Sequence, residues 1–268
     1  MSFESFYHRD GDTFVPTDAT SSPWDPRAQH GGPPAALAAF VLAERHPRED
    51  AIFARISTDF LGPIPKEPLR VQTRVLRPGG RVELLEASFE NPRDGRLAMI
   101  VRAWRIRVAD RALPQAPHAE LPPALPAPQA TQFYEGVDDG WGYGRATEWR
   151  FVRGALHELG PADVWTRVRI PLVAGTPLDP LSRLLIVADS TNGLSVELPV
   201  RDYLSIPPGL TVTIGRYPEG EWVYFSTRTQ RQPHGVGIAE GRAADVDGTL
   251  ALIAQPLLLE PRAVAQTT

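Results

Sequence analysis

Asp189 is an acidic residue at the end of a strongly apolar segment. It ends PLSRLLIVAD (residues 180–189), whose apolar spacing predicts a helix. The carbonyl end of a helix repels negative charge, which would raise the pKa of this carboxyl group and suit it to act as a base. The alternative is an aspartate that only terminates the helix by accepting backbone hydrogen bonds from residues 190–193.

Gln255 is the polar side chain of an otherwise apolar segment, LALIAQPLLL (residues 250–259), which reads as a strand. An amide that faces the interior must find a hydrogen-bond partner. Holding a water molecule for a reaction is one way to satisfy it. The other interpretation places Gln255 on the outward face of the strand, or at a bulge before Pro256.

His30, Gly31 and Gly32 directly precede two prolines and an alanine-rich run, which together predict the start of a helix. Free N–H groups at a helix start stabilise anions, and glycines let a ligand approach closely. The three residues are therefore candidates for an oxyanion or substrate-binding site. The alternative is a glycine turn in which His30 caps or packs against the helix.

Composition excludes several classes of function. The net charge of -4 gives no long-range attraction for nucleic acid or an anionic membrane. The absence of cysteine excludes disulfides, thiolate metal sites and a cysteine nucleophile. The six histidines have no paired spacing, and no P-loop, dinucleotide fingerprint or Gly-x-Ser-x-Gly motif is present, so we expect no metal and no cofactor.

The sequence shows no targeting or membrane signal. The N-terminal residues do not resemble a signal peptide, and no apolar run approaches the ~20 residues that a bilayer requires. We therefore expect a cytoplasmic protein that does not insert into a membrane.

The first part of the chain has the pattern of one helix followed by an antiparallel meander. An opening strand is predicted over residues 3–17, around a turn at Asp10 and Gly11. After the alanine-rich helix the apolar period changes to two, which predicts strands at 51–60, 69–76, 81–90 and 97–107. A helix packed across such a sheet is an α+β arrangement.

Residues 110–130 are rich in proline and alanine and predict an extended surface linker. The order of elements then repeats, with the helix at 180–189 and a left-handed stop at Asn192-Gly193. Strands are predicted at 148–156, 163–171, 194–199, 210–216, 221–230, 235–246 and 249–259. The predicted domains are an N-terminal half (1–109), a linker (110–147) and a C-terminal half (148–268).

Several short motifs occur in a characteristic order. The N-terminal half carries Trp24, His30-Gly31-Gly32 and the alanine-rich helix. The C-terminal half carries residues 188–193 (ADSTNG), Leu210-Thr211-Val212 with Arg216, residues 220–223 (GEWV) and Ala254-Gln255. Together they resemble the acyl-CoA thioesterases of the double hotdog type, the TesB-like branch of the thioesterase superfamily, over nearly the whole chain.

The resemblance implies a fold and an assembly. Two long helices would each be wrapped by an antiparallel sheet, and the two sheets would join edge to edge, which removes exposed edges. By analogy with the family, a homo-oligomer is expected, and the substrate would be an acyl-CoA.

The resemblance also implies catalytic roles. In the family, an aspartate, a hydroxyl residue and a glutamine position the attacking water, and no covalent intermediate forms; Asp189 and Gln255 match the first and last of these. The hydroxyl position falls at Pro207, which has no side-chain donor. Ser205 and Thr211 are the nearest substitutes, and Ser205 is the candidate.

Other residues would bind the substrate. Asn192 could help to hold the water, and Arg216 could bind the phosphates of CoA. Leu181, Leu185 and Phe40 could line a tunnel for the acyl chain. The expected function is therefore acyl-CoA thioesterase, acting on a fatty or other acyl thioester. The alternative, favoured by Pro207, is a non-catalytic hotdog protein that binds an acyl-CoA or another apolar ligand.

Overall fold

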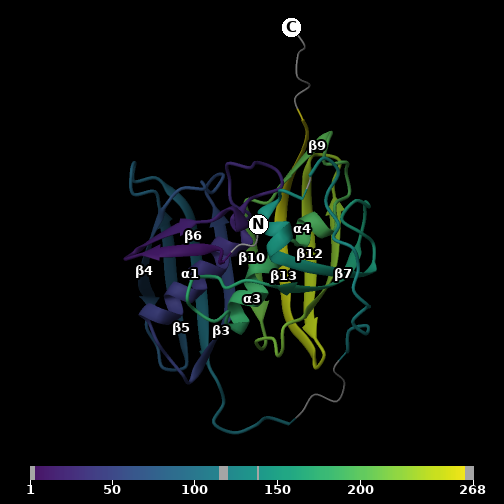
Figure 1. The fold of residues 1–268 in the computed structure, drawn as a ribbon. Coiled ribbons are helices and arrows are strands. Elements are labelled where there is room, and N and C mark those ends of the chain that lie inside the picture. Colours follow the sequence, from purple (N-terminus) through teal and green to yellow (C-terminus); the bar gives the residue numbers. More distant parts are fainter. Residues whose placement is uncertain (1–3, 115–119, 138, 263–268) are drawn as a thin grey trace.

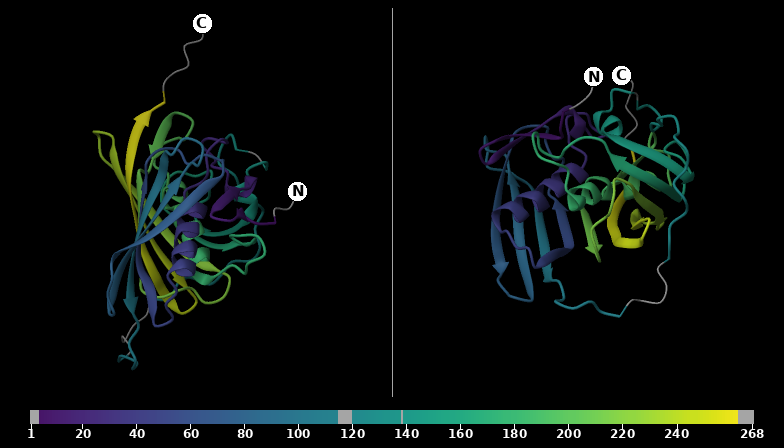
Figure 2. Two further views of the ribbon diagram at one scale, coloured as in Figure 1. Left: turned by 90° about the vertical axis from the view of Figure 1, so that its left-hand side faces the viewer. Right: turned by 60° about the horizontal axis from the view of Figure 1, so that its bottom comes forward.

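The antiparallel strands of the two halves join into one continuous sheet, with the helices on one of its faces (Figures 1 and 2). The computed structural model describes residues 4–114, 120–137 and 139–262. A few predictions therefore fall partly outside the described residues. They are the start of the opening strand at residue 3 and parts of the N-terminal half (1–109), the linker (110–147) and the C-terminal half (148–268).

The N-terminal half contains one long helix and six strands in its described residues. A short 3-10 helix, η1 (Asp18–Thr20), follows the opening hairpin. The bounds are β1 (Tyr7–Asp10), β2 (Thr13–Pro16), α1 (Gly32–Arg45), β3 (Ala51–Phe60), β4 (Leu69–Arg77), β5 (Val82–Glu90) and β6 (Leu97–Arg107). The predicted helix and meander are confirmed, and the predicted opening strand is a hairpin.

The C-terminal half, which in the structure begins at residue 142 within the predicted linker (110–147), repeats this order. Its elements are α2 (Gly142–Ala146), β7 (Thr147–Arg153), β8 (Ala162–Val168), α3 (Pro180–Ala188), α4 (Thr191–Leu194), β9 (Tyr203–Ile206), β10 (Gly209–Ile214), β11 (Val223–Arg231), β12 (Val236–Asp245) and β13 (Gly248–Pro261). The strand order of the sheet is β1-β2-β4-β5-β6-β3 in one half and β10-β13-β12-β11-β8-β7 in the other. Thus β3 corresponds to β10, and β6 to β13.

The two halves join where β3 pairs antiparallel with β10, with Ser57 opposite Thr211. This pairing removes the sheet edge that each half would otherwise expose at this position. Buried side chains of both halves form one hydrophobic cluster. None of the helices in the described part of the chain combines the length and apolar character that crossing a membrane requires.

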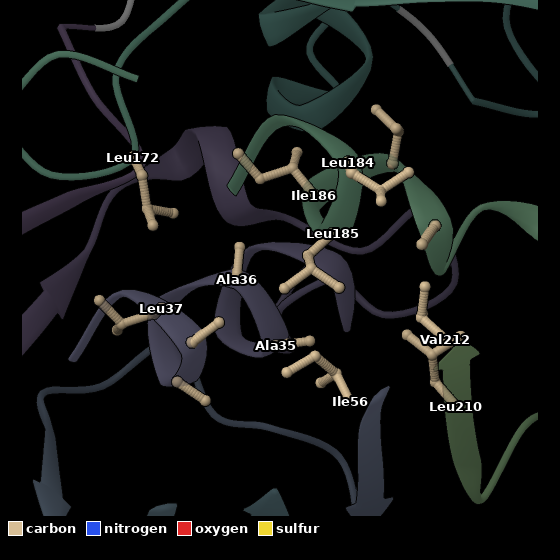
Figure 3. Packing of buried hydrophobic residues seen from close by; sticks show 14 of the residues in the cluster. Ala35, Ala36, Leu37, Ile56, Leu172, Leu184, Leu185, Ile186, Leu210 and Val212 are labelled. Carbon is tan, nitrogen blue, oxygen red and sulfur yellow. The ribbon is translucent and has the colours of Figure 1, made fainter. Parts of the chain in front are cut away.

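The central helices α1 and α3 cross in close contact and differ in length. α1 has 14 residues and α3 has 9. A Cβ atom added to Gly32 would lie 1.9 Å from the backbone oxygen of Ile186, so only glycine permits this approach. Figure 3 shows Ala35 and Ala36 of α1 beside Leu185 and Ile186 of α3. Small side chains on α1 therefore allow the close crossing.

Two predictions in the C-terminal half are wrong. Residues 195–199 form no strand, because Leu194 ends a helix and the Ser195 N–H bonds back to the oxygen of Asn192; the strand of this region is β9. Gly193 does not end a helix in a left-handed conformation, since it lies inside α4 and is not among the glycines with positive φ.

The segment between the halves has two parts. The described proline-rich residues lie along β7 and β8: Trp165 Nε1 donates to the oxygen of Pro123, and the Gln129 side chain bonds both backbone groups of Phe151. Further along, Tyr134 and Trp141 are buried in the main hydrophobic cluster. The last part of the predicted linker (110–147), beyond the proline-rich residues 110–130, therefore belongs to the core.

Candidate active site

Asp189 lies at an interruption in the C-terminal helix, between the end of α3 and the start of α4. Its side chain is 9% exposed. Two groups from different halves donate hydrogen bonds to the carboxylate: the backbone N–H of Gly31, and Nε2 of Gln255 at 2.9 Å from Oδ1. The carboxylate is therefore fixed at the boundary between the two halves.

Burial raises the pKa of Asp189 to about 6, although the hydrogen bonds from Gly31 and Gln255 act to lower it. The sequence predicted a raised pKa from the helix end, whereas the structure gives desolvation as the cause. A carboxyl group with this pKa is largely ionised at neutral pH and is a stronger base than an exposed aspartate.

Gln255 faces the interior from β13 and is fully buried. Its Oε1 accepts the backbone N–H of Asn192 at 2.9 Å, and its Nε2 donates to Asp189. Both ends of the amide therefore have partners, which accounts for a polar side chain in an apolar strand. Gln255 positions Asp189 relative to the start of α4.

His30 approaches Asp189 from the N-terminal half. Its Nδ1 lies 3.4 Å from Oδ2 of Asp189 and accepts the backbone N–H of Gly32 at 3.2 Å. Burial lowers the pKa of His30 to about 3, so the ring is neutral at pH 7 and its contact with Asp189 is not an ion pair. The ring stacks on Tyr143 at a centroid distance of 4.0 Å. His30 therefore both accepts a hydrogen bond at the start of α1 and lies close to Asp189.

Asn192 and Ser205 bond each other across the site. The Ser205 hydroxyl donates to Oδ1 of Asn192 at 2.8 Å, and Nδ2 of Asn192 donates to the backbone oxygen of Ser205 at 3.1 Å. Because the Asn192 backbone in turn donates to Gln255, a chain of hydrogen bonds runs from Ser205 to Asp189. Ser205 contacts Asn192 rather than Asp189.

A largely apolar cavity of about 540 Å³ opens beside Asp189. Its wall combines residues 22–25, 28–31 and 60–64 of the N-terminal half with residues 192–193, 196–198, 200 and 203–208 of the C-terminal half. Pro207, at the position where the sequence analysis looked for a hydroxyl, is part of this wall. A cavity of this size and character suits an apolar group of moderate size.

The structure brings several predicted residues together but not all of them. Asp189, His30, Gly31, Asn192 and Ser205 line the cavity, and Gln255 lies behind Asp189.

Arg216, the candidate for binding phosphate, does not line the cavity; both of its terminal nitrogens bond the buried Asp245. Thr211 is also absent from the wall and lies beside Ser57, with 3.4 Å between the two hydroxyl oxygens. Leu181, Leu185 and Phe40 pack in the core instead of lining a tunnel.

Arg262 and Tyr134 are among the wall residues that were not predicted from the sequence. Arg262 is the cationic side chain among the described lining residues. Tyr134 lines the cavity from the end of the segment between the halves. The aromatic residues Tyr134, Trp141 and Tyr143, unusual in an exposed linker, were the signal that this segment returns to the core. Within the described residues, no cluster of three histidine or acidic side chains could hold a metal ion.

A sheet of two corresponding halves around crossed helices, with a buried carboxylate at their boundary, defines a protein of two hotdog-like halves. Residues 20–106 match the family model of the acyl-CoA thioesterase N-terminal domain, and residues 117–259 match that of the C-terminal domain. The chain therefore belongs to the acyl-CoA thioesterase family.

Solved structures share the fold. The chain is similar to a putative thioesterase from Novosphingobium aromaticivorans, with 21% identity, a TM-score of 0.68 and coverage of 95% of this chain and 98% of that one. It is also similar to a protein with a hot dog fold from Alicyclobacillus acidocaldarius (17% identity, TM-score 0.70, 96% of each chain). A third is the acyl-CoA thioesterase II TesB2 from Mycobacterium marinum (17% identity, TM-score 0.66, 97% and 95%). No curated protein sequence matches the chain.

Proposed function

We propose that this protein hydrolyses an acyl-CoA thioester with Asp189 as the general base. The observation that carries the proposal is a buried carboxylate, with a pKa raised to about 6 by burial, at the wall of an apolar cavity. Membership of the acyl-CoA thioesterase family supports an acyl thioester as the substrate.

In the proposed reaction, Asp189 takes a proton from a bound water while the water oxygen attacks the thioester carbonyl carbon. The tetrahedral intermediate then collapses, the C–S bond breaks, and the thiolate of CoA takes the proton from Asp189. The products are a carboxylic acid and the free thiol, and no covalent bond to the protein forms. Gln255 holds the carboxylate in place, and the Asn192–Ser205 pair supports Gln255.

The start of α1 contributes to the same site. Gly31 precedes this helix, whose positive end stabilises negative charge nearby. His30 stays neutral, because burial lowers its pKa to about 3, and so adds no charge that would pair with Asp189. The carboxylate therefore keeps its ability to accept a proton from water.

The test measures release of free thiol from a series of acyl-CoAs of increasing chain length, with wild type and Asp189→Asn. We expect turnover by the wild type and a fall in kcat of about 10²–10⁴-fold in the variant, the usual contribution of a general base. Asp163→Asn is the matched control, since Asp163 lies outside the cavity and pairs with Arg153; its kcat should stay close to that of wild type. Undiminished turnover by Asp189→Asn would remove Asp189 from the reaction.

One other outcome is informative because Pro207 replaces the expected hydroxyl residue in the cavity wall. Saturable binding of acyl-CoA by the wild type with no turnover of any chain length would identify a non-catalytic binding protein and contradict the proposed reaction.

A further inference from the structure

Tyr134 belongs to the segment between the two halves and lines the same cavity as Asp189. Its side chain is buried and lines the cavity. The ring lies between two tryptophans, with centroid distances of 5.0 Å to Trp24 and 5.5 Å to Trp141. Trp141 is fixed in turn by a hydrogen bond from its Nε1 to the oxygen of Ser21. The aromatic neighbours therefore hold the Tyr134 ring in one orientation.

The hydroxyl of Tyr134 lies directly over Gly193. A Cβ atom added to Gly193 would be 2.4 Å from this hydroxyl oxygen, closer than van der Waals contact allows. Gly193 has no unusual backbone conformation, so its glycine identity serves this close approach. The hydroxyl is thereby placed next to Asn192, whose backbone N–H bonds Gln255.

No described residue accepts a hydrogen bond from this hydroxyl. Burial raises the pKa of Tyr134, and the negative charge of Asp189 raises it further, so the group remains protonated under all conditions in which Asp189 is a base. The cavity wall therefore presents, near the proposed base, an O–H donor that has no acceptor in the described part of the chain.

We propose that Tyr134 is a further catalytic residue, whose hydroxyl donates a hydrogen bond to the thioester carbonyl oxygen during attack by water. The inference rests on the proposed function. A donor is most useful at the carbonyl oxygen, where negative charge develops. A hydrogen bond to the water oxygen would instead occupy a lone pair and weaken the nucleophile. Tyr134 thus supplies a hydrogen-bond donor in the cavity wall, whereas the side chain of Pro207 can supply none.

The first test is Tyr134→Phe, which keeps the ring between Trp24 and Trp141 and removes only the hydroxyl. We expect kcat to fall by about 10²-fold or more, as for the loss of one oxyanion donor, while KM rises by a much smaller factor, of the order of the weakening expected below for a ketone ligand. Tyr224→Phe is the matched control, because Tyr224 is a buried tyrosine outside the cavity. An unchanged kcat in Tyr134→Phe would overturn the inference, and so would a rise in KM alone.

The second test separates a role at the carbonyl from a role in packing. Two non-hydrolysable ligands are compared: a 2-oxoalkyl-CoA, which keeps a ketone oxygen, and an alkyl-CoA thioether of matched length, which has none. Tyr134→Phe should weaken binding of the ketone by at least about fivefold relative to the thioether. Equal weakening of both ligands, or of neither, would contradict donation to the carbonyl.

Gly193→Ala provides an independent test of the geometry. The new methyl group should displace the Tyr134 hydroxyl, so kcat should fall in the wild-type background. In Tyr134→Phe the closest remaining ring atom would be 3.4 Å from the methyl, an ordinary contact, so adding Gly193→Ala should cause little further loss. Fully additive losses would show that Gly193 and Tyr134 act independently and would overturn the inference.

Failure of the inference about Tyr134 can be distinguished from failure of the proposed function. If the wild type hydrolyses no acyl-CoA, the proposed function fails, and the ketone and thioether affinities still decide whether Tyr134 binds a carbonyl oxygen. If the wild type is active and Asp189→Asn is impaired but Tyr134→Phe is not, the inference alone fails.

Discussion

The two ends of the crossed helices contain corresponding elements but differ in how they use polar residues. At one end, the helix of the C-terminal half is interrupted at Asp189, and the inward side chain of β13 there is Gln255. At the other end, α1 continues without interruption to Arg45. The inward polar residue on β6, the strand that corresponds to β13, is Arg105.

Arg105 forms hydrogen bonds with two partners within the protein. Its Nε donates to Glu83 at 3.0 Å, and its Nη1 donates to the oxygen of His46, directly after α1. The hydrogen bond to His46 thus ties the helix end to the sheet, and the ion pair with Glu83 fixes the guanidinium that makes it. Asp189, by contrast, lines a cavity in which a ligand can reach it. The same topology thus gives a structural anchor at one end and a carboxylate that lines a cavity at the other.

The largest expected effect tests whether the Arg105 end is only structural. Glu83→Gln leaves a buried guanidinium without its ionic partner, since the side chains of Arg105 and Glu83 are 5% and 14% exposed. Loss of one partner of a buried pair costs about 3 kcal/mol or more, so the free energy of unfolding measured in urea should fall by this amount. Below the unfolding transition, kcat should match that of wild type.

Glu240→Gln is the control for this change, because its pair with Arg228 is exposed and should contribute no more than about 1 kcal/mol. A fall in kcat for Glu83→Gln without loss of stability would contradict a purely structural role, because it would show that Arg105 or Glu83 influences the reaction.

A second prediction concerns the pH dependence of stability. Because the pKa of Asp189 is raised from 3.8 to about 6, the folded chain binds more protons than the unfolded chain between these values. The stability that the protonated Asp189 side chain contributes is therefore present below pH 4 and is lost as the pH rises through 6. From pH 4 to pH 7, wild type should lose about 2 kcal/mol relative to Asp189→Asn in urea unfolding.

The difference between the two proteins isolates Asp189. His30, whose pKa is lowered by burial, has the opposite dependence but is present in both. A difference that does not change with pH would show that Asp189 is not desolvated in the folded protein. In the active protein, the same ionisation should make kcat/KM about tenfold higher at pH 7 than at pH 5, with a midpoint near 6.

The fold was largely predictable because it follows from local periodicity. The bounds predicted for 51–60 and 97–107 coincide with β3 and β6. The prediction failed at 194–199, where the apolar alternation is short and the backbone continues from a helix into the cavity wall. Local patterns therefore identify the sheet but not the irregular segments that line the site.

Two residues of the site were predictable because each contrasts with its own segment. Asp189 and Gln255 each interrupt an apolar run, and the structure brings them together. Arg216 has no such contrast, and nothing in the sequence shows that Asp245 occupies it. The role of Tyr134 could not be predicted from the sequence either. The glycine that makes room for its hydroxyl is Gly193, which lies 59 positions later in the chain.

The smallest expected effect compares the two helix starts. At the start of α1, the Gly31 N–H is directed to Asp189, whereas at the start of α3 the Asp179 side chain accepts the N–H of Ser182 at 2.9 Å. The second interaction is a local cap, so Asp179→Ala should lower the free energy of unfolding by about 1 kcal/mol and leave kcat unchanged. Asp179→Ser, which keeps a capping oxygen, should recover most of that loss. A fall in kcat in Asp179→Ala that recovers in Asp179→Ser would contradict this expectation. It would mean that the start of α3 influences the reaction through Asp189, at the other end of the same helix. The two helix starts would then no longer be functionally distinct.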